Sequence, residues 1–336
     1  MQAATNRPIY ACRIFADEQT GQPVNHLTMS LRIALLFSGQ GAQQPGMGKD
    51  FFELYADVRN LFREADLTLG RKLSELCFHG SIEDLTASAN CQPAIFCVSV
   101  AACLALHKER PFKPVACAGL SLGEYAALHC AGSLGFAETL KLVARRGELM
   151  DRACREHDGG MAALLSVPQE IIAELCAKHK LEIANYNSPD QTIISGASVA
   201  INAVLNDLHE LGQKAVRLQV AGAFHSSLMH GAQELFAPEL AKYTFNPPQC
   251  LFAQNYSGSF TSCPDEISDN LLRQVSGSVR WEDCFRLLMA NSDLCIELGP
   301  GTVLSGLAKR IQRDFPVFSI NSVDSLQQTL AALREI

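Results

Sequence analysis

Gly-Leu-Ser-Leu-Gly-Glu-Tyr (119–125) directly follows the short apolar run Pro-Val-Ala-Cys-Ala (114–118) and precedes a helical pattern. A serine between two glycines at a strand end is the layout of a nucleophile elbow, where the chain turns sharply from strand to helix. A Cβ on either side would collide with the neighbouring strand or helix. The stretch therefore predicts an α/β fold that exposes Ser121 as a candidate nucleophile. Because the motif is short, an ordinary turn is the alternative at this point.

The space beside Ser121 has candidate hydrogen-bond donors from two segments. The first is the backbone N–H of Leu122 at the start of the predicted helix, where positive partial charge favours a developing oxyanion. The second is Gln40, which lies between two glycines in the stretch 32–43, an expected buried strand that runs into a glycine-rich loop. Such loops at the carboxyl ends of strands face ligands. We expect a helix to begin near Lys49.

Nucleotide binding does not fit this glycine-rich loop. Position 44 is Gln where a dinucleotide loop needs its third glycine, and Gly46 is followed by Met47-Gly48 where a phosphate loop needs lysine and a hydroxyl residue. We therefore expect Gln40 to face a reacting carbonyl, with a plain tight turn as the alternative.

A hydroxyl nucleophile needs an adjacent base. Among the nine histidines, His225 fits best, because it follows an expected strand in the small-residue loop 220–229. Arg146 lies in a helical pattern at 142–150. Taken singly, a histidine at a strand end is more often structural, and an arginine on a helix more often forms a surface ion pair.

These segments together resemble the malonyl-CoA:acyl carrier protein transacylase family, from about Ser30 to Ile311. The resemblance includes Asn-Ser-Pro at 187–189 and Glu-Leu-Gly-Pro-Gly at 297–301. Their order and spacing along nearly the whole chain are more specific than any single motif.

The resemblance implies a role for each candidate residue. Ser121 would be the acylated nucleophile, His225 its base, Gln40 and the Leu122 N–H the oxyanion donors, and Arg146 the partner of the malonyl carboxylate. It also implies that a backbone carbonyl near 277–281, rather than an acidic side chain, orients the histidine. The implied partners are malonyl-CoA and an acyl carrier protein, with no cofactor and no metal.

Three positions bear on which acyl group is accepted. Phe224, before the histidine, accompanies malonyl preference in related polyketide acyltransferases, since an aromatic ring fills the space of a 2-methyl group; core packing is the alternative. Leu120 stands where many relatives have histidine, and Arg280 where they often have glutamine. We interpret Leu120 as a subgroup trait that leaves the acyl range open.

Composition agrees with a cytoplasmic enzyme. The net charge of −7 disfavours nucleic-acid binding, and the apolar stretch 94–106 is too short to span a bilayer, so we expect a buried helix and no membrane. The thirteen cysteines are scattered singly, which favours buried reduced thiols over metal sites or disulfides. Residues 1–28 do not resemble a secretory signal.

Periodicity predicts two domains. A large α/β-hydrolase-like domain with a mostly parallel sheet is expected from 30–155 and 222–336, including a return strand at 294–298. Between them, 156–221 is expected to form a ferredoxin-like βαββαβ unit. Its expected elements are strand 161–167, helix 168–179, strands 182–188 and 191–197, helix 198–212 and strand 214–220.

Because this unit separates Ser121 from His225 in sequence, the two should meet at the domain junction. Residues 1–29 would be an extension, expected to be disordered unless Met29 is the biological start. We expect a monomer.

Three functions remain open from the sequence. The favoured one is malonyl transfer to a carrier protein of fatty-acid or polyketide synthesis. A hydrolase that clears acyl groups from carrier proteins would use Ser121 and His225 but would not need Arg146. A noncatalytic carrier-protein-binding module would be expected to have lost Ser121 or His225, and both are present.

Overall fold

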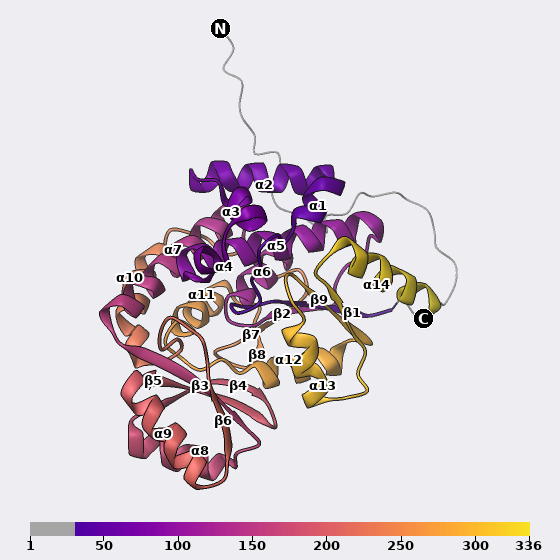
Figure 1. Cartoon of the computed structure of the whole chain (residues 1–336). Coiled ribbons are helices and arrows are strands. Elements are labelled where there is room, and N and C mark those ends of the chain that lie inside the picture. Colours follow the sequence, from indigo (N-terminus) through magenta and orange to yellow (C-terminus); the bar gives the residue numbers. More distant parts are fainter. Residues whose placement is uncertain (1–30) are drawn as a thin grey trace.

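The structure is a computed structural model that describes residues 31–336, so the predicted N-terminal extension lies outside the described residues. Its larger part is built on a mostly parallel sheet (Figure 1). The last strand pairs antiparallel to its neighbour and the others pair parallel. In spatial order the strands are β10 (Val317–Ile320), β9 (Leu294–Leu298), β1 (Ile33–Phe37), β2 (Ala116–Gly119), β7 (Leu251–Gln254) and β8 (Ser259–Phe260).

Helices bury both faces of this sheet. Along β1, Leu35 and Phe37 pack into one hydrophobic cluster while Ala34 and Leu36 pack into another on the opposite face, as alternation along a strand requires. The second face is covered by α12 (Trp281–Asn291) and α13 (Val303–Ile311). The first cluster includes side chains from α1 (Lys49–Leu54), α2 (Ala56–Leu69), α3 (Leu73–His79), α4 (Ile82–Thr86), α5 (Ser88–Glu109), α6 (Gly123–Cys130), α7 (Phe136–Glu156), α10 (His230–Leu240), α11 (Pro264–Arg273) and α14 (Val323–Glu335).

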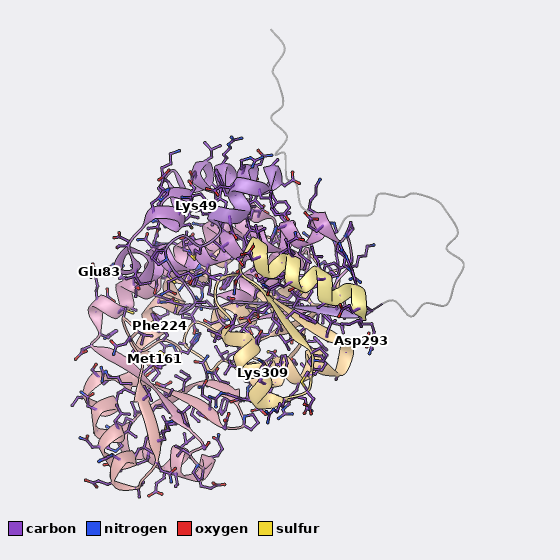
Figure 2. The ribbon with its side chains drawn as sticks, turned by 45° about the vertical axis from the view of Figure 1, so that its right-hand side comes forward. Lys49, Glu83, Met161, Phe224, Asp293 and Lys309 are labelled. Carbon is purple, nitrogen blue, oxygen red and sulfur yellow. The ribbon has the colours of Figure 1, made fainter. Side chains whose placement is uncertain are left out.

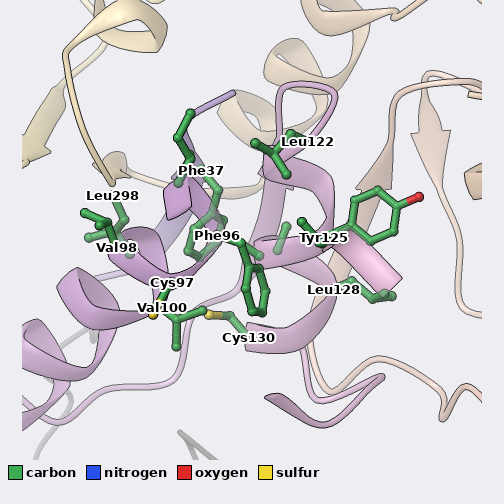
Figure 3. Close-up of a cluster of buried hydrophobic side chains, with 14 of the residues drawn as sticks. Phe37, Phe96, Cys97, Val98, Val100, Leu122, Tyr125, Leu128, Cys130 and Leu298 are labelled. Carbon is green, nitrogen blue, oxygen red and sulfur yellow. The ribbon is translucent and has the colours of Figure 1, made fainter. Parts of the chain in front are cut away.

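Helix α5 is the central core helix, as the apolar stretch 94–106 predicted. By length and composition alone it could span a membrane, but 83% of its most apolar window is buried inside the protein. Figure 3 shows Phe96 of this helix beside Phe37 of the sheet and Cys130 of α6. Helix α5 therefore belongs to the interior of the large domain.

The smaller part is an antiparallel sheet in the order β4-β5-β3-β6, which is the ferredoxin-like order that the βαββαβ pattern predicts. Helices α8 and α9 pack with Ala162, Leu164 and Ile194 on one face. On the other face, Met161 and Ile193 line a cavity. The elements are β3 (Gly159–Leu165), α8 (Gln169–His179), β4 (Glu182–Ser188), β5 (Gln191–Ala197), α9 (Ser198–Glu210) and β6 (Lys214–Arg217).

The fold class is thus confirmed, with local corrections. The strand predicted at 161–167 runs two residues earlier, and the one predicted at 214–220 ends at Arg217. After β6 the chain leaves the sheet edge, and residues 218–221 line the cavity, which is why the strand is shorter than its apolar pattern suggests. The domain boundaries at 155/156 and 221/222 stay predictions.

Candidate active site

The turn between β2 and α6 depends on both glycines that flank the serine. A Cβ on Gly119 would lie 2.0 Å from the carbonyl carbon of Gly123, and one on Gly123 would lie 2.1 Å from the carbonyl oxygen of Phe37. Ser121 itself has a φ of 51°, in the left-handed region that costs energy for a residue with a side chain. The sequence pattern therefore produces a strained elbow that places the serine at the end of the central sheet.

His225 meets this serine from the loop that follows the small sheet. Its Nε2 lies 2.8 Å from Ser121 Oγ, and its Nδ1 lies 2.8 Å from the backbone carbonyl oxygen of Gln274, at the end of α11. A carbonyl only accepts hydrogen bonds, so Nδ1 carries the proton and Nε2 is free to accept from the serine hydroxyl. Like Ser121, His225 has a positive φ, of 57°.

The environment keeps His225 neutral. The pKa of its imidazole is lowered to about 4, first by burial and then by the positive charge of Arg146, while the backbone contacts with Gln274 and Gly277 act in the opposite direction. At neutral pH the ring is therefore neutral, with its one proton on Nδ1, and Nε2 is available as a proton acceptor.

Arg146 is buried beside the same hydroxyl with no carboxylate among its hydrogen-bond partners in residues 31–336. Its Nη1 donates to Gln92 Oε1 at 2.7 Å, and its Nη2 donates to Gln274 Oε1 at 3.0 Å and to Ser121 Oγ at 3.1 Å. The Nε atom has no partner within the described chain. The guanidinium also lies over the Tyr125 ring, 5.5 Å from its centroid. Burial lowers the pKa of Arg146, and the nearby Tyr125 and Glu124 side chains act in the opposite direction.

The glycine-rich loop reaches the site through Gln40. Gln40 Nε2 donates to Ser88 Oγ at 3.2 Å, and Gln92 Nε2 lies 3.5 Å from Gln40 Oε1. Both partners are on α5, whose first N–H groups, of Ser88 and Ala89, donate to the Asp151 carboxylate at 2.8 Å. The loop amide is thus tied to the helix that also contacts Arg146.

Leu122 provides a backbone donor at the start of α6. The next three N–H groups have acceptors three residues back: Gly123 donates to Leu120, Glu124 to Ser121, and Tyr125 to Leu122. This leaves the Leu122 N–H as the first-turn group that can serve a ligand. The Leu122 side chain is buried in the core (Figure 3).

A cavity of about 300 Å³ lies between the end of the large sheet and the inner face of the small one. Gln40, Ser121, Arg146, Phe224 and His225 all line it, so the structure brings these candidates together. Figure 2 shows Phe224 near Met161 where the small sheet adjoins the large part. Other lining residues include Leu120, Met150, Ala163 and Ile193. Within the described chain, no group of three or more His, Cys, Asp or Glu residues could hold a metal ion.

The cysteines of the described part of the chain are all free, and most are buried. Burial raises the pKa of thiols such as Cys97 and Cys295, which makes them unreactive. Residues 31–336 carry no disulfide, and the interpretation of reduced thiols stays a prediction.

The sequence did not identify Gln92, Gln274 and Asn255, which contact the candidate groups, or Glu124, which contacts Gln274 and Asn255. Asn255 holds the elbow from both sides, since its Oδ1 accepts from the Ser121 N–H at 2.6 Å and its Nδ2 donates to the Gly119 carbonyl at 2.8 Å. For Glu124, the signal was its place in the elbow motif at 119–125. For Gln92, an amide just before the apolar stretch 94–106 was the available signal.

Glu124 is fully buried beneath the elbow. Burial raises the pKa of its carboxyl to about 7, opposed by hydrogen bonds from Asn255, Gln274 and Gln254 and by the charge of Arg146. The other titratable groups that interact with it electrostatically are Tyr125 on its own helix and Cys284 on α12. Near neutral pH this carboxyl is close to its point of ionisation.

Comparison with known proteins agrees with this geometry. The family model of the acyl transferase domain matches residues 34–299. The chain thus contains an acyltransferase domain. A malonyl CoA-acyl carrier protein transacylase of Bacillus subtilis is 36% identical over 311 residues, covering 90% of this chain and 98% of that protein. The chain belongs to the malonyl-CoA:acyl carrier protein transacylase family.

Further similarities point the same way. The crystal structure of a malonyl CoA-acyl carrier protein transacylase from Clostridium perfringens has a TM-score of 0.86 and 36% identity, and the match covers 90% of this chain and 98% of that one. The polyketide biosynthesis protein PksE of Bacillus subtilis is 36% identical over 84% of this chain, which spans 37% of PksE. The identity to PksE equals that to the Bacillus subtilis transacylase, over a shorter part of this chain.

Proposed function

We propose that the protein transfers a malonyl group from malonyl-CoA to the phosphopantetheine thiol of an acyl carrier protein, through an ester on Ser121. The observation that carries the proposal is the buried Arg146 guanidinium, whose hydrogen bonds go to neutral oxygens only. A buried charge that no carboxylate contacts directly is costly. A carboxylate on the acyl group attached to Ser121 would supply that contact in a bidentate pair.

The first half-reaction follows from the hydrogen bonds. His225 Nε2 takes the proton of Ser121 Oγ as the oxygen attacks the thioester carbonyl. The negative charge that develops on the carbonyl oxygen is stabilised by the Leu122 N–H and by Gln40. When the carbon–sulfur bond breaks, the leaving thiol of coenzyme A takes the proton from His225, and the acyl group remains on Ser121.

The second half-reaction reverses these steps on a new sulfur. The carrier thiol gives its proton to His225 and attacks the ester, and Ser121 Oγ takes the proton back as the thioester forms. No cofactor takes part. Phe224 would fill the space of a 2-methyl substituent, an exclusion worth about 1–3 kcal/mol. We infer that the enzyme acts as a cytoplasmic monomer, with no nucleic acid or membrane as partner.

Intact-mass spectrometry tests the proposal directly. The protein is mixed briefly with malonyl-CoA and then with a pantetheinylated carrier protein, and both masses are followed. We expect a malonyl adduct on the enzyme that moves to the carrier, and no adduct on Ser121→Ala. Decay to free malonate with an unloaded carrier would instead identify an acyl hydrolase, and an adduct on Ser121→Ala would refute the serine mechanism.

A further inference from the structure

The carboxylate of Glu124 lies one helical turn beyond the nucleophile and is fully buried. Its exposed fraction is 0%. It accepts hydrogen bonds from three N–H groups: Gln254 Nε2 at 3.1 Å, the Asn255 backbone at 2.9 Å and Gln274 Nε2 at 2.7 Å. No ion pair within 31–336 joins it directly to a cation. A carboxylate held this way is an acceptor facing only donors.

Gln274 connects this carboxylate to the reacting groups. Its Nε2 donates to Glu124 and, at 3.1 Å, to the Ser121 carbonyl, while its Oε1 accepts from Arg146. Its amide therefore has only one satisfactory orientation. If the amide turned over, its NH₂ would face the guanidinium, which has no acceptor, and its oxygen would face the Glu124 carboxylate, which has no donor.

We propose that Glu124 is a positioning residue that fixes the Gln274 amide with its oxygen on Arg146, and so holds the guanidinium where the carboxylate of the acyl group is bound. Glu124 touches no reacting atom itself. The inference rests on the proposed function, since it assigns Arg146 to that carboxylate. The His225 contact uses the backbone carbonyl of Gln274 and does not depend on the amide orientation.

Glu124→Gln tests this assignment with little change in shape. A glutamine offers one acceptor oxygen and an NH₂ group to a site of three donors, so at least one donor meets another donor unless Gln274 turns over. We expect malonyl transfer to lose about tenfold or more in kcat/KM and acetyl transfer to lose much less, because one unsatisfied buried group has a cost of that size. An unchanged malonyl-to-acetyl ratio would overturn the assignment.

A double-variant cycle separates positioning from general destabilisation. In the Arg146→Ala background, Glu124→Gln should have little further effect on malonyl transfer. If the fold-loss in kcat/KM of the double variant equalled the product of the two single losses, the result would count against the proposal. Glu297→Gln is the matched control, because Glu297 is also fully buried and accepts from the N–H groups of Leu304 and Ser305 at the start of α13, outside the candidate site. It should lower stability without changing the ratio.

Two further readouts keep the test decisive. If Glu124→Gln does not fold, Gln274→Leu removes the same amide from the other end and should lower the ratio alike; an unchanged ratio would refute the proposal. If the wild type transfers no malonyl group, the proposed function fails. The assignment of Glu124 is then tested by the NMR resonance of the Gln274 side-chain NH₂ group, which is identified by its absence in Gln274→Leu. This resonance should shift in Glu124→Gln, and an unshifted resonance would overturn the assignment of Glu124.

Discussion

Replacing Arg146 by alanine should change which acyl group the enzyme prefers. The proposed pair between guanidinium and malonyl carboxylate comprises two charge-assisted hydrogen bonds, each worth about 1.5–3 kcal/mol. Loss of about 3 kcal/mol from the lower end of that range corresponds to a roughly 150-fold lower kcat/KM for malonyl-CoA. Acetyl-CoA has no carboxylate and loses only the contact of Arg146 with Ser121 Oγ, 3.1 Å long, so its loss should be about tenfold or less.

The assay is the initial rate of transfer to a carrier protein from malonyl-CoA and, separately, from acetyl-CoA. Arg146→Lys keeps the charge without the planar fork and should fall between the wild type and Arg146→Ala. Arg145→Ala is the matched control, because Arg145 is the neighbour on α7 and forms exposed ion pairs with Glu148 and Glu239. Thermal unfolding checks that each variant folds. Equal losses for both substrates in Arg146→Ala would refute the reasoning and make Arg146 structural.

Three other predictions concern pH and packing. The kcat/KM for acetyl transfer should stay level from pH 8 to about 5 and fall near pH 4, where His225 takes up a proton. A fall in kcat/KM that begins near pH 6.5 would contradict the lowered pKa. Because Glu124 has a pKa of about 7 and acts as a carboxylate, the malonyl-to-acetyl ratio should fall from pH 8 to 6 in the wild type and stay level in Glu124→Gln. Gly123→Ala should lose about 3 kcal/mol in urea unfolding from overpacking against β1. Gly306→Ala, with open space around its Cβ, should not destabilise, and equal effects of the two would contradict the steric argument.

The features that sequence predicted well are those encoded by neighbouring residues. The elbow needs glycines at 119 and 123, and the structure shows a backbone contact at each that leaves no room for a Cβ. Alternation of apolar residues predicted the βαββαβ unit, because each strand buries one face under α8 and α9. The end of β6 was misplaced, since an apolar segment that lines a cavity has the same composition as one that continues a strand.

The supporting contacts could not be predicted because they are long-range and made by common residues. Gln274 lies 153 residues from Ser121 in sequence and 128 from Arg146. No local pattern distinguishes it from a surface glutamine, and it acts partly through its backbone carbonyl, whose role does not depend on residue type. The atoms of Gln274 reach Ser121, Arg146 and His225 only because the folded chain places the end of α11 beside the elbow.

The charge of Arg146, which no carboxylate contacts directly, links the choice of acyl group to the strength of His225 as a base. In the unliganded site this charge helps to lower the pKa of His225. In the proposed acyl-enzyme the malonyl carboxylate would offset that charge, while burial, the larger cause, would still hold the pKa of His225 below its ordinary value. The ring would then be a stronger base for the carrier thiol than in the unliganded site. An acetyl group brings no such charge and leaves His225 weak. A single buried arginine would therefore favour malonyl twice, once in binding the acyl group and again in the proton transfer that releases it.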